Sequence, residues 1–138
     1  MKKALLILAM TILMATPVQA TELSSEDMTL LSQVVYCEAG NQSLEGKRLV
    51  TAVVLNRMDS EAFPNTVQEV LSQEGQFTTY KHLSKAKPTV YDMLAVQLEV
   101  NNRSNTEVMF FRTQRYGCGR PLFQCEDHYF SGLKEVSI

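Results

Sequence analysis

The amino-acid sequence predicts a small α+β domain, in which a helical core of three main helices precedes a short antiparallel β-sheet. Apolar residues recur at helical spacing in three long segments before residue 103. Short β-branched and aromatic runs appear only after Asn105. Helices that precede strands, instead of alternating with them, favour the α+β class. With 138 residues, the chain is long enough for one hydrophobic core and too short for two.

The beginning of the chain predicts a secretory signal peptide over 1–20. Two lysines follow the first Met, residues 4–14 are almost wholly apolar, and small residues lead to a cleavage site after Ala20. The apolar run is shorter than the roughly 20 residues of a transmembrane helix, which disfavours stable membrane insertion. We therefore expect an exported protein, in the periplasm, cell wall or extracellular space, with one domain at 21–138. Loss of the two lysines would change the net charge from −2 to −4.

The first helix is predicted over 25–39. Ser24 suits the N-cap position, and two acidic residues follow in the first turn. Gly40 suits a left-handed C-cap that would end the helix. One face carries residues at spacings of three, four and seven, namely Met28, Leu31, Val34, Val35 and Glu38.

Two more long helices are predicted between residues 44 and 102. The helix at 44–58 is apolar almost all round, which is typical of a buried central helix. A short helix at 66–71 follows a Phe-Pro-Asn turn, and Pro88 opens the third long helix at 89–102. The polar connection 72–86 is longer than most loops, which indicates a functional loop.

The C-terminal part predicts strands at 108–112 and 128–130, with a Gly-, Cys- and Pro-rich hairpin region between them. Cys118 and Cys125 bracket this region, and export permits disulfides, so we expect them to be bonded to each other. The alternative is two reduced thiols, and Cys37 is left over. Two histidines and the absence of a C-x-x-C motif argue against a metal site, and no cofactor is implied.

Composition narrows the classes of partner. The net charge of −2 is too mild for a nucleic-acid binder that works by neutralising phosphates. A hydrophobic content of 45% is too high for a disordered chain. The chain contains no Trp, so any sugar-stacking surface must rely on Phe and Tyr.

Glu38 is the first candidate for a catalytic residue. It lies seven residues after Leu31 on the apolar stripe, so the helix carries its carboxyl into or beside the core. Burial and the negative C-terminal end of the helix both disfavour the carboxylate and raise its pKa. A carboxylic acid that stays protonated near neutral pH can act as a general acid. The alternative is a solvated Glu at a frayed helix end.

A series of segments between about residues 30 and 130 resembles, in order, the spore cortex-lytic type of cell wall hydrolase. These are the Tyr-Cys-Glu-Ala of 36–39, the Glu-Gly-Lys of 45–47, the Asn-Arg of 56–57, the Phe-Pro-Asn-Thr-Val of 63–67, the Gln-Glu-Gly-Gln-Phe-Thr of 73–78, the Met-Phe-Phe of 109–111 and the His-Tyr-Phe of 128–130. The sequence departs from the family pattern at 40–42, where Gly-Asn-Gln replaces Arg-Gly-Glu, and at 112–113, where Arg-Thr replaces Asn-Pro.

The resemblance implies a small lysozyme-like domain, similar to resuscitation-promoting domains, that cleaves the MurNAc–GlcNAc glycan strand of peptidoglycan. It assigns the general acid to Glu38 and places the polar loop and the aromatic strand along a sugar groove. The candidate substrate-binding residues are Gln76, Phe77, Tyr80, Phe111, His128 and Tyr129. Each of them also has a structural interpretation, since strand aromatics are more often part of a core and a buried His more often satisfies a structural contact.

The sequence leaves the second carboxylate of a glycosidase open. Glu45 is the leading candidate, although it also fits an N-terminal helix acid that the dipole favours. The others are Asp59, Glu61 and Glu74. Without a second carboxylate, Glu38 acts first as acid and then as base while the 6-hydroxyl of the sugar attacks. We favour this lytic transglycosylation, with 1,6-anhydroMurNAc ends, over hydrolysis by water.

Two other functions stay open at this point. A Cys37-dependent amidase or peptidase would use His82 or His128 as its base. Cys37 lies off the apolar stripe, and no Asn or Asp has a recognisable orienting position, which disfavours this chemistry. Alternatively, a secreted carbohydrate-binding or lysozyme-inhibiting module would leave Glu38 with a structural role only.

Overall fold

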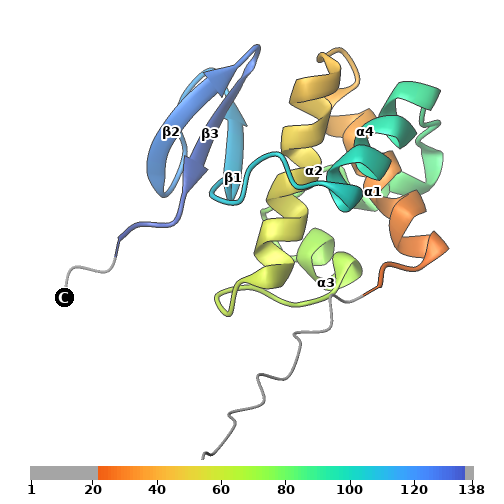
Figure 1. Cartoon of the computed structure of the whole chain (residues 1–138), viewed down its shortest axis with the longest axis horizontal. Coiled ribbons are helices and arrows are strands. Elements are labelled where there is room, and N and C mark those ends of the chain that lie inside the picture. The colour runs from red at the N-terminus through yellow and green to blue at the C-terminus, as the bar shows by residue number, and fades with distance from the viewer. Residues whose placement is uncertain (1–21, 136–138) are drawn as a thin grey trace, which may run out of the picture.

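The computed structural model describes residues 22–135, and the predicted signal peptide at 1–20 lies outside them. The described part of the chain folds as helices followed by a sheet (Figure 1). The elements are α1 (Ser25–Ala39), α2 (Leu44–Asp59), α3 (Val67–Ser72), the 3₁₀ helix η1 (Tyr80–Lys85), α4 (Val90–Asn101), β1 (Phe110–Thr113), β2 (Arg120–Cys125) and β3 (His128–Gly132). The predicted α+β class and helix positions are confirmed. Among the described residues, no helix is long and apolar enough to cross a membrane.

Helix α2 is the centre of the fold, as its uniform apolar character predicts. Figure 1 shows α2 between the sheet on one side and the other helices on the opposite side. Residues from Leu49 to Arg57 are all buried, and α1, α3, α4 and β1 contact the helix. Because α2 is enclosed on every side, it positions both halves of the molecule relative to each other.

Local caps explain why the helices begin where they do. The Ser24 and Thr89 side chains accept hydrogen bonds from the third residue of α1 and of α4, and the acidic side chains at those positions return a contact to the cap. Ser43 caps α2 through the backbone N–H of Gly46. These contacts involve residues three apart, so the sequence alone predicts the N-terminal ends well.

The end of α1 differs from the prediction. Gly40 has φ −57° and ψ −32°, a right-handed conformation and not the left-handed C-cap that we expected. The Lys47 ammonium instead donates to the carbonyl oxygens of Ala39 and Gly40, at 2.9 and 3.1 Å. A cation from the next helix therefore satisfies carbonyls that the end of α1 leaves without a partner inside the helix.

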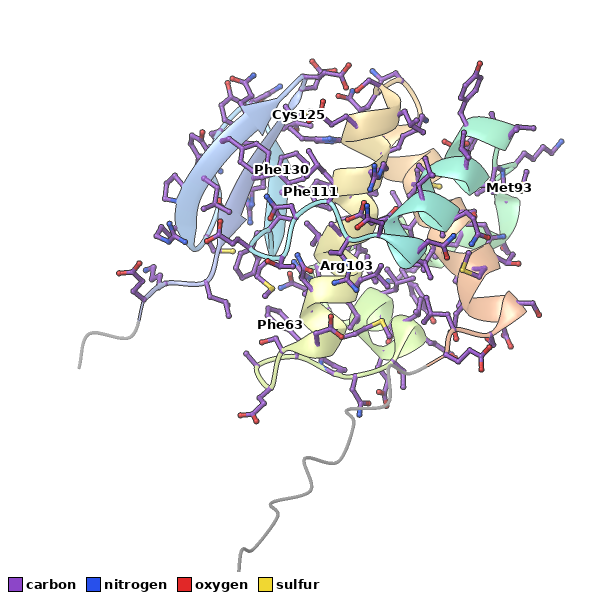
Figure 2. The ribbon with its side chains drawn as sticks, viewed as in Figure 1. Phe63, Met93, Arg103, Phe111, Cys125 and Phe130 are labelled. Carbon is purple, nitrogen blue, oxygen red and sulfur yellow. The ribbon has the colours of Figure 1, made fainter. Side chains whose placement is uncertain are left out.

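The sheet has the strand order β1–β3–β2, and both pairings are antiparallel. Phe111 and Phe123 both lie opposite Phe130, so these rings share one face. Figure 2 shows Phe111 and Phe130 on the side of the sheet that faces α2. Phe130 is fully buried, and its ring lies 6.2 Å from that of Phe111 and 5.5 Å from that of Phe123. This face closes the core of the domain.

The predicted disulfide between Cys118 and Cys125 is wrong, since both cysteines are unpaired. The region between them is a strand and not a loop: Cys118 precedes β2, and Cys125 is its last residue. Extended backbone advances about 3.3 Å per residue, which separates the two Cα atoms by roughly 20 Å. A disulfide requires a Cα–Cα separation of about 5.5 Å.

Candidate active site

Glu38 lies in the last turn of α1, half-buried, with its carboxyl against the loop that precedes η1. The hydroxyl of Thr79 donates a hydrogen bond to Glu38 Oε1 at 2.6 Å. Burial raises the pKa of Glu38 above its ordinary value, and the Thr79 hydrogen bond offsets part of that rise. The carboxyl thus has the environment that the apolar stripe predicted. Thr79 lies forty-one positions away in the sequence, and no local pattern marked it.

A groove of about 550 Å³ opens beside this carboxyl. It is formed by the end of α1, the loop before η1, α2, β1 and the segment that follows β1. The lining residues are Glu38, Arg57, Gly75, Gln76, Thr78, Phe110, Phe111, Arg112, Thr113, Gln114, Arg115, Cys118 and His128. Of the predicted substrate-binding residues, Gln76, Phe111 and His128 therefore lie together with Glu38.

The other predicted site residues lie elsewhere. Phe77 is only 5% exposed and belongs to the core. Tyr80 packs partly buried against the core and is not among the groove residues. Tyr129 contributes to a separate shallow hollow on the outer part of the sheet and stacks edge-on with Tyr116 at 5.1 Å. Glu45 is exposed in the first turn of α2 and does not line the groove.

His128 forms part of the groove wall as a neutral imidazole. It is 3% exposed, and its ring meets that of Phe111 edge-on at 5.1 Å. Burial lowers its pKa, against smaller opposing effects from Asp127, Glu126 and the Glu38 backbone. Its Nδ1 atom is buried without a hydrogen-bond partner. The ring thus lies close to the Glu38 backbone, where the sheet meets the end of α1.

Arg57 is a groove residue whose position the sequence did not reveal. It is 3% exposed, and its Nε donates to the carbonyl oxygen of Met109 at 2.7 Å. The guanidinium carbon lies 5.0 to 5.3 Å from the ring centroids of Phe63, Phe77 and Phe110. Burial lowers its pKa to about 10, which leaves it charged at neutral pH. The available signal was a cationic residue close after the apolar run 49–55 of a helix predicted to be buried.

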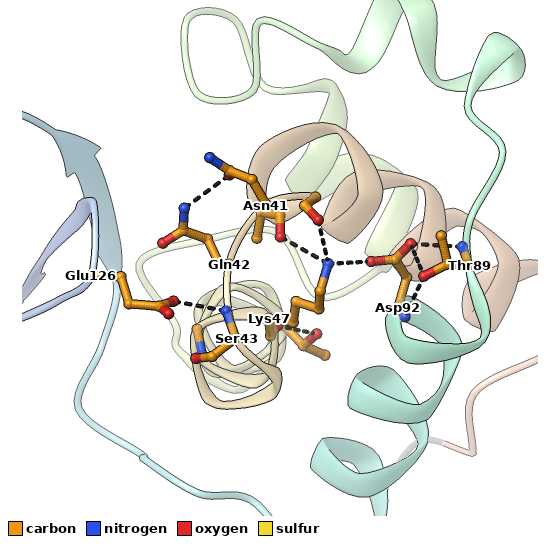
Figure 3. Close-up of polar contacts among 11 residues, drawn as sticks. Asn41, Gln42, Ser43, Lys47, Thr89, Asp92 and Glu126 are labelled. Atoms are coloured by element: carbon orange, nitrogen blue, oxygen red, sulfur yellow. Dashed lines mark hydrogen bonds and ion pairs between the residues drawn. The ribbon is translucent and has the colours of Figure 1, made fainter.

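The end of α1 that carries Glu38 is held by a buried ion pair (Figure 3). Lys47 Nζ, already bonded to the carbonyl oxygens at the end of α1, also lies 2.6 Å from Asp92 Oδ1, and the two side chains are 6% and 0% exposed. Asp92 also accepts hydrogen bonds from the backbone N–H and hydroxyl of Thr89 at the start of α4. Three helix ends therefore meet at one ammonium group, directly after the candidate acid.

The turn between β2 and β3 is tied to the loop between α1 and α2. Glu126 accepts a hydrogen bond from the backbone N–H of Ser43 at 2.8 Å (Figure 3). Gln42 also donates a hydrogen bond to Asp127, at 2.9 Å. Gly46 permits this approach, because a Cβ there would lie 2.9 Å from Glu126 Oε2. These contacts fix the strand that begins with His128 beside the helix that ends after Glu38.

A second, larger hollow of about 1140 Å³ lies near the start of α1 and the ends of α2 and α4. Its walls include Leu23, Met28, Leu55, Met58 and Arg103. Glu38 is not among its lining residues, and neither are the residues that surround Glu38. The smaller groove is therefore the candidate active site, because only it combines a carboxyl of raised pKa with polar and aromatic walls.

A half-buried carboxyl in an open groove, between a helical core and a small sheet, is an arrangement suited to an enzyme that cleaves glycosidic bonds. Residues 41–130 match the sequence model of the family described as Cell Wall Hydrolase, and the chain belongs to this family. This membership confirms the resemblance drawn from the sequence and places the chain among enzymes instead of non-catalytic binding modules. The matched segment begins three residues after Glu38, so it does not itself include the candidate acid.

Curated relatives and solved structures agree with this assignment. The spore cortex-lytic enzyme of Bacillus subtilis (strain 168) is 44% identical over 55 residues, which cover 40% of this chain and 18% of that protein. The corresponding enzyme of Oceanobacillus iheyensis is 42% identical over 55 residues, covering 40% and 20%. The aligned segment thus spans about a fifth of these relatives.

The fold is similar to that of the catalytic domain of the Bacillus cereus SleB protein, with a TM-score of 0.71 at 23% identity over 81% of this chain and 94% of that one. The catalytic domain of the germination-specific lytic transglycosylase SleB from Bacillus anthracis gives a TM-score of 0.70 at 23% identity, over 81% and 98%. The predicted fold is confirmed.

Proposed function

We propose that this chain cleaves the MurNAc–GlcNAc glycan strand of peptidoglycan, with Glu38 as the general acid. The observation that carries the proposal is the Glu38 carboxyl itself: half-buried, raised in pKa and exposed to a groove of about 550 Å³. A protonated carboxyl at such a position can give its proton to a glycosidic oxygen as that bond breaks. The predicted leader at 1–20 would bring the enzyme to the compartment that holds this substrate.

The groove favours lytic transglycosylation over hydrolysis. Both mechanisms of glycoside hydrolysis use a pair of carboxylates on either side of the scissile bond. Among the described residues that line the groove, Glu38 is the sole acidic one. A mechanism that uses one carboxyl twice fits this groove better than one that requires two. The Bacillus anthracis domain of similar fold is itself described as a lytic transglycosylase.

The proposed steps balance with Glu38 alone. Its carboxyl donates a proton to the glycosidic oxygen, and the bond between that oxygen and C1 of the muramyl sugar breaks. Glu38, now a carboxylate, removes the proton from the C6 hydroxyl of the same sugar. The C6 oxygen then bonds to C1, which closes the 1,6-anhydro ring and returns Glu38 to its protonated state. Thr79 holds the carboxyl through both transfers by its hydrogen bond at 2.6 Å.

Cys37 does not fit the alternative role of nucleophile. It is not among the groove residues, and burial and the neighbouring Glu38 carboxylate raise the pKa of its thiol. A thiol of raised pKa carries little of the reactive thiolate at neutral pH.

The test is the analysis of muropeptides released from purified sacculi in water enriched in ¹⁸O. Transglycosylation gives 1,6-anhydro ends without the heavy isotope, whereas hydrolysis gives reducing ends that carry it. Glu38→Gln should lower the rate by roughly 10²–10⁴-fold, the usual contribution of a general acid. Glu26→Gln, an exposed carboxyl of the same helix, is the matched control and should keep full activity. Isotope-labelled ends, or full activity in Glu38→Gln, would contradict the proposal.

A further inference from the structure

The groove beside Glu38 is rich in arginine. Arg57, Arg112 and Arg115 all line it, and Glu38 is the one acidic residue among the described lining side chains. Since Glu38 is protonated in the state that starts the reaction, the groove then carries three positive charges and no negative one. This local charge is opposite in sign to the net charge of the chain, which is −2.

The arginines of the groove also differ from the other arginines in their ion pairing. Within residues 22–135, the arginines outside the groove each pair with a carboxylate: Arg48 with Glu99 at 2.9 Å, Arg103 with Asp59 at 3.1 Å and Arg120 with Glu107 at 3.4 Å. The three groove arginines form no ion pair in this part of the chain. The unpaired arginines of the described chain are thus gathered at the candidate active site.

Arg57 shows that this arrangement is costly for the protein alone. Its side chain is 3% exposed, and its Nη1 atom is buried without a hydrogen-bond partner. A buried guanidinium without a counter-ion is unfavourable, and three aromatic rings and one carbonyl oxygen compensate only in part. An anion in the groove would supply the missing counter-charge.

The Arg112 side chain passes close to the backbone of Gly117. Its Cδ and Nε atoms each lie 2.6 Å from the position that a Cβ on Gly117 would take. The missing side chain at Gly117 therefore leaves the space through which Arg112 runs. Gln114, between them, has φ 71°, a left-handed conformation that reverses the chain after β1. Gly117 thus gives the exposed Arg112 side chain room to lie against the segment after β1.

We propose that the groove binds a carboxylate of its glycan substrate through Arg112 and Arg115, with the buried charge of Arg57 in the same wall. This inference rests on the proposed function and names the substrate chemistry of the same site. Two parts of peptidoglycan carry a carboxylate: the peptide stem, and the lactyl group of a muramic acid that has lost its stem. A guanidinium pairs with either through two parallel hydrogen bonds.

The net charge of the chain makes this inference distinguishable from general electrostatic attraction. An acidic protein is repelled by an anionic wall, so removing the carboxylates of the wall should strengthen its binding if net charge governs. If the groove arginines govern, the same treatment should weaken binding. The two explanations predict opposite signs.

The experiment measures binding by co-sedimentation, with the Glu38→Gln variant so that the wall is not degraded. One probe is purified sacculi with free stem carboxylates. Another is glycan strands stripped of their stems by an amidase and attached through their reducing ends to agarose beads, since strands without cross-links are soluble. Each is also used after carbodiimide coupling to a neutral amine. The test variant adds Arg112→Gln and Arg115→Gln, and the control adds Arg120→Gln, an exposed arginine outside the groove that pairs with Glu107.

We expect the double arginine variant to bind the untreated probe about tenfold more weakly, the scale of one or two charged hydrogen bonds. On the coupled probe it should match its parent, because the carboxylate is gone. The probe that shows this difference identifies the stem or the lactyl group as the source. The Arg120 control should bind all probes as its parent does.

The inference is overturned if the parent binds the coupled probes as tightly as the untreated ones, or more tightly. It is also overturned if the double arginine variant loses as much affinity for the coupled probes as for the untreated ones. The proposed function has a separate readout. Equal cleavage of untreated and coupled sacculi by the unmodified chain would leave the proposed function standing without the carboxylate site. Carboxylate-dependent binding without any released muropeptide would leave the site standing without the proposed function.

Discussion

Replacement of Lys47 by Met removes the ammonium on which three helix ends converge. Asp92 then remains buried, at 0% exposure, without the partner that lies 2.6 Å away in the native protein. Leaving one member of a buried ion pair unpaired costs about 3–5 kcal/mol, a large part of the roughly 5–15 kcal/mol that stabilises a domain. We expect the midpoint of thermal unfolding to fall by roughly 10–20 °C.

The pH dependence of this loss is specific to the pair. Burial alone would raise the pKa of Asp92, but the hydrogen bonds from Lys47 and Thr89 outweigh it and hold the pKa below the ordinary value of 3.8. In the native protein, Asp92 therefore stabilises the fold above that value and ceases to do so as the pH falls through its lower, folded pKa. In Lys47→Met, burial dominates and Asp92 takes up a proton in mild acid. The deficit of the variant should therefore shrink between pH 7 and about pH 4.

Urea unfolding of matched variants measures these free energies. The double variant Lys47→Met/Asp92→Asn keeps an acceptor for Thr89 but carries no buried charge, so it should recover more than half of the lost stability. Asp59→Asn breaks an exposed pair with Arg103 and should cost less than about 1 kcal/mol. The ion pair does not hold the helix ends together if Lys47→Met costs no more than Asp59→Asn. The same follows if the loss of stability in Lys47→Met changes neither with pH nor on adding Asp92→Asn.

Three further predictions concern the site and the sheet. Thr79→Val removes the hydrogen bond that lowers the pKa of Glu38, so the protonated acid should persist to higher pH. The alkaline limb of the pH–activity profile should therefore shift to higher pH, and an unshifted limb would show that Thr79 does not act on this carboxyl. Cys118→Ser and Cys125→Ser should leave the unfolding midpoint unchanged under oxidising conditions, whereas a shared drop in both variants would indicate a bond between them. Glu126→Ala removes the side chain that accepts a hydrogen bond from Ser43 at the start of α2. It should lower the free energy of urea unfolding by about 1 kcal/mol, as the loss of a helix cap does. An unchanged free energy would mean that the 2.8 Å contact does not stabilise the fold.

The helices could be predicted from the sequence because their signals are local. The caps at Ser24, Ser43 and Thr89 involve residues three positions apart, and the apolar stripe that places Glu38 repeats within one helix. The disulfide was predicted wrongly because Gly and Pro suggested a loop. Pro121 lies in β2, an edge strand, where a missing N–H is tolerated.

The groove could not be predicted from the sequence, because contacts that no short sequence pattern reveals hold its walls together. Arg57 meets the Met109 carbonyl across fifty-two positions, and Thr79 meets Glu38 across forty-one. The position of Tyr129 outside the groove, in contrast, could be predicted from the sequence. His128 and Phe130 face the core, and strand residues alternate between faces, so Tyr129 between them must point outward.

The two halves of the groove are joined at the turn between β2 and β3. The helical half contributes Glu38, and the sheet half contributes Phe111 and His128. Glu126 and Asp127 bind the loop that directly follows Glu38, and His128 comes next in the chain. The distance between the acid and the sheet wall is therefore set by contacts outside the groove. Substitutions at this turn should alter substrate affinity and turnover together, even where neither Glu38 nor His128 is changed, because they move one wall relative to the other.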